Sequence, residues 1–153
     1  EQVRDPFGKL YFPYFKGRDG CRSPMPWQPD QLFAGFSAVD PWLPLGPDHA
    51  ARSVAAQQAR TSSVLAFSKQ VIGLRKERAA LRLGDMTLLE TNDDVLAFTR
   101  TLDGQSVTCV FNFSDAPISV DTNQQAAPVL TLGDTENDGD KITVSPLGVF
   151  VGA

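Results

Sequence analysis

Residues 16–27, KGRDGCRSPMPW, combine the residue types that bind and transform polar ligands. Arg18 and Arg22 carry guanidinium groups, whose fixed fork of donors suits carboxylates and hydroxyl groups. Asp19 lies between them and Cys21 adds a thiol. The stretch has neither helical nor strand periodicity, so we expect a loop. Loops carry function when a rigid scaffold positions them, so the function of this stretch depends on the elements around it.

The other groups that could do chemistry are few. His49 stands alone, without Cys or carboxylate neighbours at metal-ligand spacing, so we expect no metal site there. We expect Cys21 to be a small packed residue and not a nucleophile, because no His lies nearby in the sequence. Residues 134–140, DTENDGD, resemble part of a calcium loop, but the twelfth position is Ser145 and not Glu. We interpret the segment as a polar hairpin turn.

The elements that must position these residues change in character along the chain. Residues 1–50 hold most of the eleven prolines and most of the aromatic residues, which predicts a long aromatic loop that needs a surface to pack on. Residues 53–83 have helical periodicity, with Ser53 and either Ser62 or Ser63 as N-caps and Gly84 as the stop. The helix carries an apolar stripe, formed by Val64, Leu65, Phe67, Val71, Ile72 and Leu74.

From Met86 onward the period is that of strands. Seven short segments rich in β-branched and aromatic residues are separated by turn residues, which predicts an antiparallel β-sandwich. Asp103-Gly104 predicts a two-residue hairpin, because a type I′ turn needs positive φ at both central residues. The formal net charge of −4, with scattered basic residues, argues against nucleic-acid binding.

At this level of detail the chain resembles a known family. The stretches GRDGCRSPMPW, AGFS, PWLPLGPDH, SVAAQQ and GLRKERAALRLG are similar to those of α-glucosidases and oligo-1,6-glucosidases of the α-amylase superfamily, glycoside hydrolase family 13. The later stretches VFNFSDAPISV and VSPLGVFVGA resemble the C-terminal β-domain of the same family, with less specific motifs. The resemblance covers the chain almost from end to end.

The resemblance implies a catalytic (β/α)₈ (TIM) barrel followed by a β-sandwich. Such a barrel takes about 250 residues, so this chain is too short to hold one. We therefore expect a mainly β chain that starts within the loop after the eighth barrel strand. Residues 1–83 are then the end of the barrel, with an active-site loop at 1–50 and helices at 53–83, and residues 84–153 are the β-sandwich. The apolar helix stripe is expected to face the rest of the barrel.

The resemblance also implies roles for single residues. The two catalytic carboxyl groups of a retaining glycosidase lie on earlier strands of the family's barrel, so we expect no catalytic residue in this chain. Arg22 matches the family arginine that binds the glucose at the non-reducing end. The alternative is that Arg22 only braces the loop by pairing with Asp19.

Four further residues are candidates for lining the pocket: Arg18, Asp19, Trp27 and Trp42. For Arg18 and Asp19 we favour a structural ion pair within the loop over direct contact with substrate. The two tryptophans are candidate sugar platforms, although such aromatic residues more often pack a loop onto its scaffold.

The resemblance therefore predicts the C-terminal part of a retaining α-glucosidase that releases terminal α-linked glucose from short oligosaccharides. Its partners are the α-glucoside substrate and the N-terminal barrel portion of the same enzyme. No cofactor or metal is implied, and neither nucleic acid nor a membrane is expected as a partner. The alternatives are a free-standing accessory or carbohydrate-binding β-sandwich, or part of a related glucosyltransferase or sucrose isomerase. Two unpaired cysteines and the family favour the bacterial cytoplasm, with the periplasm as the alternative.

Overall fold

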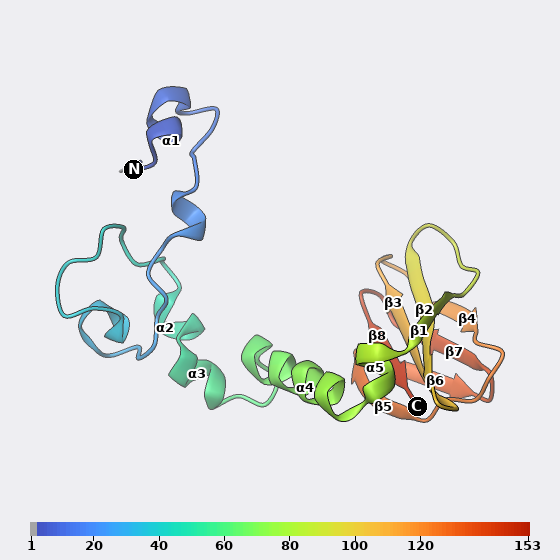
Figure 1. The fold of residues 1–153 in the computed structure, drawn as a ribbon. Helices are drawn as coiled ribbons and strands as arrows, with labels where there is room; N and C mark the ends of the chain where they lie inside the picture. Colours follow the sequence, from blue (N-terminus) through green and yellow to red (C-terminus); the bar gives the residue numbers. More distant parts are fainter. Residues whose placement is uncertain (1–2) are drawn as a thin grey trace. The chain divides into compact units, whose positions relative to one another are not determined.

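The computed structural model describes residues 3–153. The chain forms two compact units, Glu1–Lys69 and Gln70–Ala153. The dividing point lies inside α4 (Val64–Glu77), the longest helix of the described chain (Figure 1). Among the described residues, no helix has the length and apolar character required to cross a membrane.

The second unit is a β-sandwich, as the sequence predicts. Its larger sheet has the strand order β1-β2-β3-β8-β5 and its smaller sheet the order β4-β7-β6, with every neighbouring pair antiparallel (Figure 1). The strands are β1 (Asp85–Leu88), β2 (Val95–Leu102), β3 (Gln105–Asn112), β4 (Ile118–Asp121), β5 (Pro128–Leu132), β6 (Thr135–Asp138), β7 (Lys141–Val144) and β8 (Val149–Gly152).

Turn chemistry sets the register of the first hairpin. β2 and β3 are joined by Asp103 and Gly104, with φ of 50° and 78°, and Leu102 lies opposite Gln105. Both central residues have the positive φ of a type I′ turn, which confirms the expectation from the sequence. The turn therefore holds in register the longest pair of strands in the sandwich.

The segment 134–140 differs from the expectation, because part of it is a strand. Thr135–Asp138 forms β6, which pairs with β7 so that Asp138 lies opposite Lys141. The turn itself contains Gly139, at a φ of 68°. An exposed edge strand made of polar residues lacks the alternation and the propensity that identify strands in a sequence. Within residues 3–153, no group of three or more His, Cys, Asp or Glu side chains could hold a metal ion.

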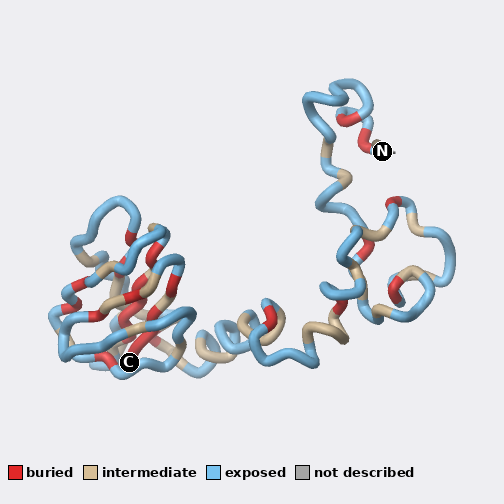
Figure 2. The backbone as a smooth tube through the Cα atoms, turned by 180° about the vertical axis from the view of Figure 1, so that it is seen from behind, coloured by how far each residue is buried: buried red, intermediate tan, exposed pale blue. Residues whose placement is uncertain are grey.

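The core of the sandwich lies between the two sheets, where the buried residues cluster (Figure 2). Phe150 and Val110 of the larger sheet meet Ile142 and Val144 of the smaller one, and all four are fully buried. Asn112, at the end of β3, joins the two sheets. Its amide nitrogen donates to the carbonyl oxygens of Ala116, Val144 and Ser145.

A second cluster covers the outer face of the larger sheet. Ala80 of α5 (Ala79–Leu83) packs with Val107, Cys109 and Val151, and Leu74 packs against the same cluster. The prediction that Leu74 faces a barrel is therefore wrong for this residue, because the sandwich takes up its side chain. Burial raises the pKa of the Cys109 thiol to about 11.

The sequence predicts two helical pieces over residues 53–83, one starting at Ser53 and one at Ser62 or Ser63, and the structure interrupts the second of them. α3 (Val54–Gln58) and α4 are separate, and α4 and α5 are divided at Arg78, which is extended with φ −98° and ψ 104°. Ser53 caps α3 as predicted, and Ser63 Oγ accepts the Ala66 N–H in the first turn of α4. The break at Arg78 turns α5 onto the sheet, a tertiary requirement that helical periodicity does not encode.

Gly84 ends α5 as expected, but the reason is a close approach of two backbones. Its own φ is −67°, so no left-handed conformation is involved. A Cβ at this position would lie 2.6 Å from the carbonyl oxygen of Ala80 and 2.7 Å from that of Thr101. Only glycine fits between the end of α5 and β2.

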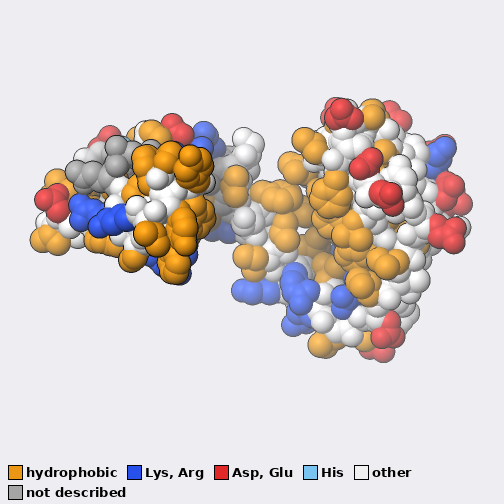
Figure 3. Space-filling model, turned by 90° about the horizontal axis from the view of Figure 1, so that it is seen from above, with side chains coloured by type: hydrophobic (Ala, Val, Ile, Leu, Met, Phe, Trp, Pro, Cys, Tyr) orange, Lys and Arg blue, Asp and Glu red, His pale blue; other side chains and the backbone are white. Residues whose placement is uncertain are grey.

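The first unit has more local structure than the predicted loop. It contains the helices α1 (Pro6–Tyr11), α2 (His49–Arg52) and α3, and the 3₁₀ turns η1 (Asp19–Cys21) and η2 (Leu32–Gly35). Many of its aromatic side chains are exposed, and Tyr14 is 97% exposed. Hydrophobic side chains cover much of the visible surface of this unit in Figure 3. Such a surface marks an interface.

Candidate functional site

The centre of the candidate site is Asp5, a residue that the sequence analysis did not single out. Its side chain has no exposed surface. Asp5 caps α1, because its Oδ1 accepts the N–H groups of Phe7 at 2.9 Å and Gly8 at 3.2 Å. Pro6 follows it at the first helical position, where a fixed φ suits the helix and no N–H is needed.

The second oxygen of Asp5 binds both arginines of the 16–27 loop. Arg18 Nε donates to Oδ2 at 3.1 Å, and Arg22 Nη1 donates to the same atom at 3.2 Å. The structure thus brings Arg18 and Arg22 together on one carboxylate. A charge-assisted contact of this kind is stronger than a neutral hydrogen bond, and burial of the acceptor limits screening by water.

The ion pairs expected from the sequence are therefore corrected. Arg18 pairs with Asp5, not with Asp19, and Asp5 also replaces Asp19 as the brace of Arg22. The Asp19 carboxylate accepts backbone N–H groups instead, from Arg4 at 2.6 Å and from Asp5 at 3.0 Å. Contacts between residues more than ten positions apart, as here, depend on the folded chain and leave no local pattern.

The loop closes tightly around Asp5. Gly17 has a φ of 72°, and a Cβ there would lie 2.6 Å from the Asp5 Cβ. A larger residue at position 17 is excluded by both backbone conformation and space. Cys21 is exposed, which corrects the expectation of a packed residue, and its Sγ donates to the Arg18 carbonyl oxygen at 3.0 Å.

The surroundings of Asp5 keep its carboxyl group ionised. The hydrogen bond from the Gly8 N–H is the largest cause that holds the pKa of Asp5 below its ordinary value of 3.8. Burial acts in the opposite direction, and the Arg18 guanidinium lowers the pKa further. The charge that binds the two arginines is therefore present throughout the neutral range.

A concavity of about 420 Å³ lies beside this loop. Two segments form most of its wall, the first including Lys16, Gly17, Asp19, Gly20 and Ser23, and the second Leu43, Pro44, Leu45, Gly46 and Pro47. Of the residues predicted for a pocket, Asp19 lies in this wall. The Arg22 side chain is 35% exposed and that of Arg18 59% exposed, so both side chains reach solvent.

Trp27 and Trp42 are half-exposed, at 47% and 53%, and neither lines this concavity. The backbone of Trp27 has a structural role. Its N–H donates to the carbonyl oxygen of Ala34, and its own carbonyl accepts the N–H of Ala55 at the start of α3. The segment around Trp27 therefore holds the first turn of α3 in place.

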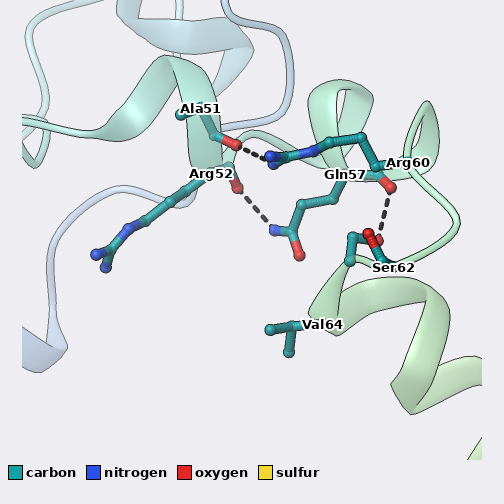
Figure 4. A pocket seen from close by; sticks show the side chains of 7 residues that line it. Ala51, Arg52, Gln57, Arg60, Ser62 and Val64 are labelled. Atoms are coloured by element: carbon teal, nitrogen blue, oxygen red, sulfur yellow. Dashed lines mark hydrogen bonds between the residues drawn. The ribbon is translucent and has the colours of Figure 1, made fainter. Parts of the chain in front are cut away.

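A larger concavity, of about 550 Å³, lies where α2, α3 and the start of α4 meet (Figure 4). Two of its polar side chains already bind backbone carbonyl groups. Arg60 donates to the Ala51 carbonyl and Gln57 to the Arg52 carbonyl, both at 2.8 Å, so they satisfy the C-terminal carbonyl groups of α2. This concavity is better explained by helix capping than by ligand binding.

Comparison with known proteins places the chain in a family. Residues 3–84 match the model of the alpha amylase catalytic domain, and residues 86–151 match the maltogenic amylase C-terminal domain. The chain belongs to the α-amylase family. The mainly β fold with a C-terminal antiparallel sandwich agrees with this membership.

Individual relatives refine the comparison. The chain is 42% identical over 117 residues to a probable alpha-glucosidase of Rhizobium meliloti, a match that covers 75% of this chain and 21% of the relative. It is 35% identical over 116 residues to an oligo-1,6-glucosidase of Parageobacillus thermoglucosidasius, covering 75% and 20% respectively.

Among solved structures, an alpha-glucosyl transfer enzyme, XgtA, superposes with a TM-score of 0.80 at 35% identity, covering 99% of this chain and 29% of that one. The chain thus spans about a fifth of the length of the relatives named above, and less than a third of this solved structure.

Sequence reasoning missed Asp5, although a local signal was present. Asp followed by Pro is a typical helix start, with the carboxylate as N-cap and Pro at the first helical position. That signal predicts α1 but says nothing of the arginines. The second role of Asp5 depends on the loop folding back over α1.

Proposed function

We propose that this chain is the C-terminal part of a retaining α-glucosidase that hydrolyses terminal α-linked glucose from short oligosaccharides. The observation that carries the proposal is the 42% identity to a probable alpha-glucosidase. Residues 1–83 supply the end of the catalytic barrel and residues 84–153 the β-domain. The rest of the barrel, as partner, supplies the catalytic carboxyl groups, so this chain alone is inactive.

In this proposal the substrate contact is made by Arg22, with Arg18 and Asp19 beside it. The ion pair with Asp5 fixes one nitrogen of the Arg22 guanidinium group. This contact restrains the guanidinium group, and its other donors suit the hydroxyl groups of a terminal glucose. Trp27 and Trp42 remain candidate platforms at the mouth of the pocket.

Glucosyl transfer is the second candidate reaction. It is favoured by the likeness to an alpha-glucosyl transfer enzyme over nearly the whole chain. Hydrolysis and transfer differ in whether water or a sugar hydroxyl attacks the glycosyl-enzyme intermediate in the second step. The residues that this chain contributes to the site can therefore serve either reaction. A free-standing β-sandwich module does not explain why residues 3–84 match a catalytic domain.

We also propose the bacterial cytoplasm as the location, on the grounds of the two free cysteines. Fractionation of cells that produce the native protein tests it. Recovery with a cytoplasmic marker supports the proposal, and recovery with a periplasmic marker contradicts it.

The experiment starts with a denaturing intact-mass spectrum and an assay with a chromogenic α-glucoside. The samples are this chain and the complete polypeptide that contains it. We expect glucose release from the complete polypeptide and none from the 16.6 kDa chain. NMR of the first-formed sugar should show the α-anomer, and analysis of products at high substrate concentration separates hydrolysis from transfer. Hydrolysis by the chain alone would contradict the proposed location of the catalytic carboxyl groups.

Arg22→Lys provides the matched variant. Lysine keeps the positive charge but loses the planar fork, so we expect KM to rise about tenfold, as for the loss of one charge-assisted hydrogen bond. Arg75→Lys, at the end of α4, is the control substitution and should leave KM unchanged. Equal kinetics for the Arg22 variant and the wild type would remove Arg22 from the site.

A further inference from the structure

Among residues 3–153, the Asp5 carboxylate is a fully buried charged group that binds both Arg18 and Arg22. We propose that Asp5 is a positioning residue, which holds both guanidinium groups and so keeps Arg22 in the orientation used for sugar binding. This inference rests on the proposed function, because Asp5 acts on sugar binding only if Arg22 binds the substrate. Asp5 itself touches no substrate in this account.

The two oxygens of Asp5 have separate tasks. Oδ1 accepts the first-turn N–H groups of α1, while Oδ2 accepts from Arg18 and Arg22. Capping a helix needs only one acceptor, which Ser, Thr or Asn supplies as well as Asp. The helix cap alone therefore does not explain a buried carboxylate that also binds two cations.

The Asp5 side chain is held in place by its neighbours. Asp5 has no exposed surface, its backbone N–H is bound by Asp19, and Gly17 packs directly against its Cβ. A carboxylate that is buried and restrained by its neighbours offers the arginines one acceptor position. An exposed carboxylate would move with its side chain and orient them poorly.

The geometry leaves donors for a ligand. Asp5 engages only Nε of Arg18 and Nη1 of Arg22. Within residues 3–153, the other two nitrogens of each guanidinium group have no hydrogen-bond partner. Both side chains also reach solvent, so each arginine is held at one edge and open at another. This arrangement suits recognition of a polyhydroxyl ligand.

Two variants separate positioning from helix capping. Asp5→Asn and Asp5→Ser both keep an N-cap oxygen, and neither keeps the carboxylate that binds the arginines. Asp48→Asn is the matched control. It removes an exposed Asp carboxylate from an ion pair with Arg52, where the oxygen and nitrogen are 3.3 Å apart, and it lies outside the arginine cluster. Circular dichroism confirms that each variant is folded.

The first readout is NMR of the arginine side chains in the complete polypeptide that contains this chain. In the wild type we expect Nε–H of Arg18 to be shifted and slow to exchange with water, because it is bound to a buried carboxylate. In both Asp5 variants this signal should move to the position of a solvated arginine, and in Asp48→Asn it should not move. An unchanged Arg18 signal in folded Asp5→Asn and Asp5→Ser would overturn the inference.

The second readout is kinetic, in the complete polypeptide with a chromogenic α-glucoside. Loss of orientation should raise KM about tenfold with little change in kcat, because Arg22 binds the substrate and does not react. A merely structural role would lower the amount of active enzyme and leave KM unchanged, which would overturn the inference. If the wild type releases no glucose, the proposed function fails, and with it the purpose assigned to Asp5. The NMR result then still decides separately whether Asp5 holds the arginines.

Discussion

At the scale of single residues, ionisation and burial decide what each group can do. The buried carboxylate of Asp5 stays charged because N–H donors and Arg18 stabilise the charge against the cost of burial. The two thiols differ from each other in burial. Cys21 is exposed, whereas Cys109 lies in the cluster beneath α5, and burial raises its pKa to about 11.

The pKa of Asp5 predicts a loss of stability in acid. Its folded-state pKa lies below 3.8, so the stability contributed by the ionised carboxylate is complete above about pH 5 and is lost as the pH falls below 3.8. We expect the difference in unfolding free energy between the wild type and Asp5→Asn to shrink over that range. Urea unfolding at a series of pH values measures it. A difference that is the same at pH 3 and pH 7 would contradict the prediction.

The thiols predict selective labelling. At pH 8 only about one Cys109 in a thousand is a thiolate, given a pKa of about 11, and the side chain is buried. Iodoacetamide should therefore modify Cys21 within minutes and Cys109 only after unfolding, as mass spectrometry of peptides can show. The raised pKa also predicts that stability falls as the pH rises above 9, since the unfolded thiol ionises first. Equal labelling of the two thiols in the folded chain would contradict this account.

At the scale of elements, backbone conformation decides the effect of a substitution even where space is free. Gly73 in α4 and Gly104 in the β2–β3 turn both have nothing within 4 Å of an added Cβ. Gly73 is helical, while Gly104 has a φ of 78°. The two sites therefore differ only in the conformation that alanine must adopt.

We expect opposite signs for the two alanine substitutions. Gly73→Ala should stabilise the chain by about 0.5 to 1 kcal/mol, because alanine is the better helix former. Gly104→Ala should destabilise it by about 1 kcal/mol, because alanine rarely adopts positive φ. Chemical denaturation of both variants beside the wild type measures the two values. Equal effects of the same sign would show that space, and not conformation, governs these positions.

At the scale of the whole molecule, the exposed apolar side chains lie on α4 and in the first unit, among other places. On α4, Val64 is 76% exposed and Ile72 55% exposed, and further aromatic side chains are exposed in the first unit. The relatives that the chain matches are about five times as long. Such surfaces mark an interface with further protein or a tendency to aggregate.

We therefore predict that the isolated chain self-associates. Light scattering at increasing concentration should show a molar mass above that of the monomer, and Ile72→Glu should lower it by placing a charge on the apolar stripe. Gln70→Glu, an exposed polar position on the same helix, is the control and should have no effect. A monomer at all concentrations would contradict the prediction.

The sequence by itself determined the family, the antiparallel strands from Met86 onward, the 103–104 hairpin, the cap at Ser53 and a second cap at either Ser62 or Ser63. Each depends on neighbouring residues, whose types and spacing carry the signal. Only the tertiary structure decided the break at Arg78, the docking of Leu74 on the sandwich and the polar edge strand β6. It also decided that Asp5, and not Asp19, binds both arginines. These features depend on contacts between residues far apart in the chain, which a local pattern does not record.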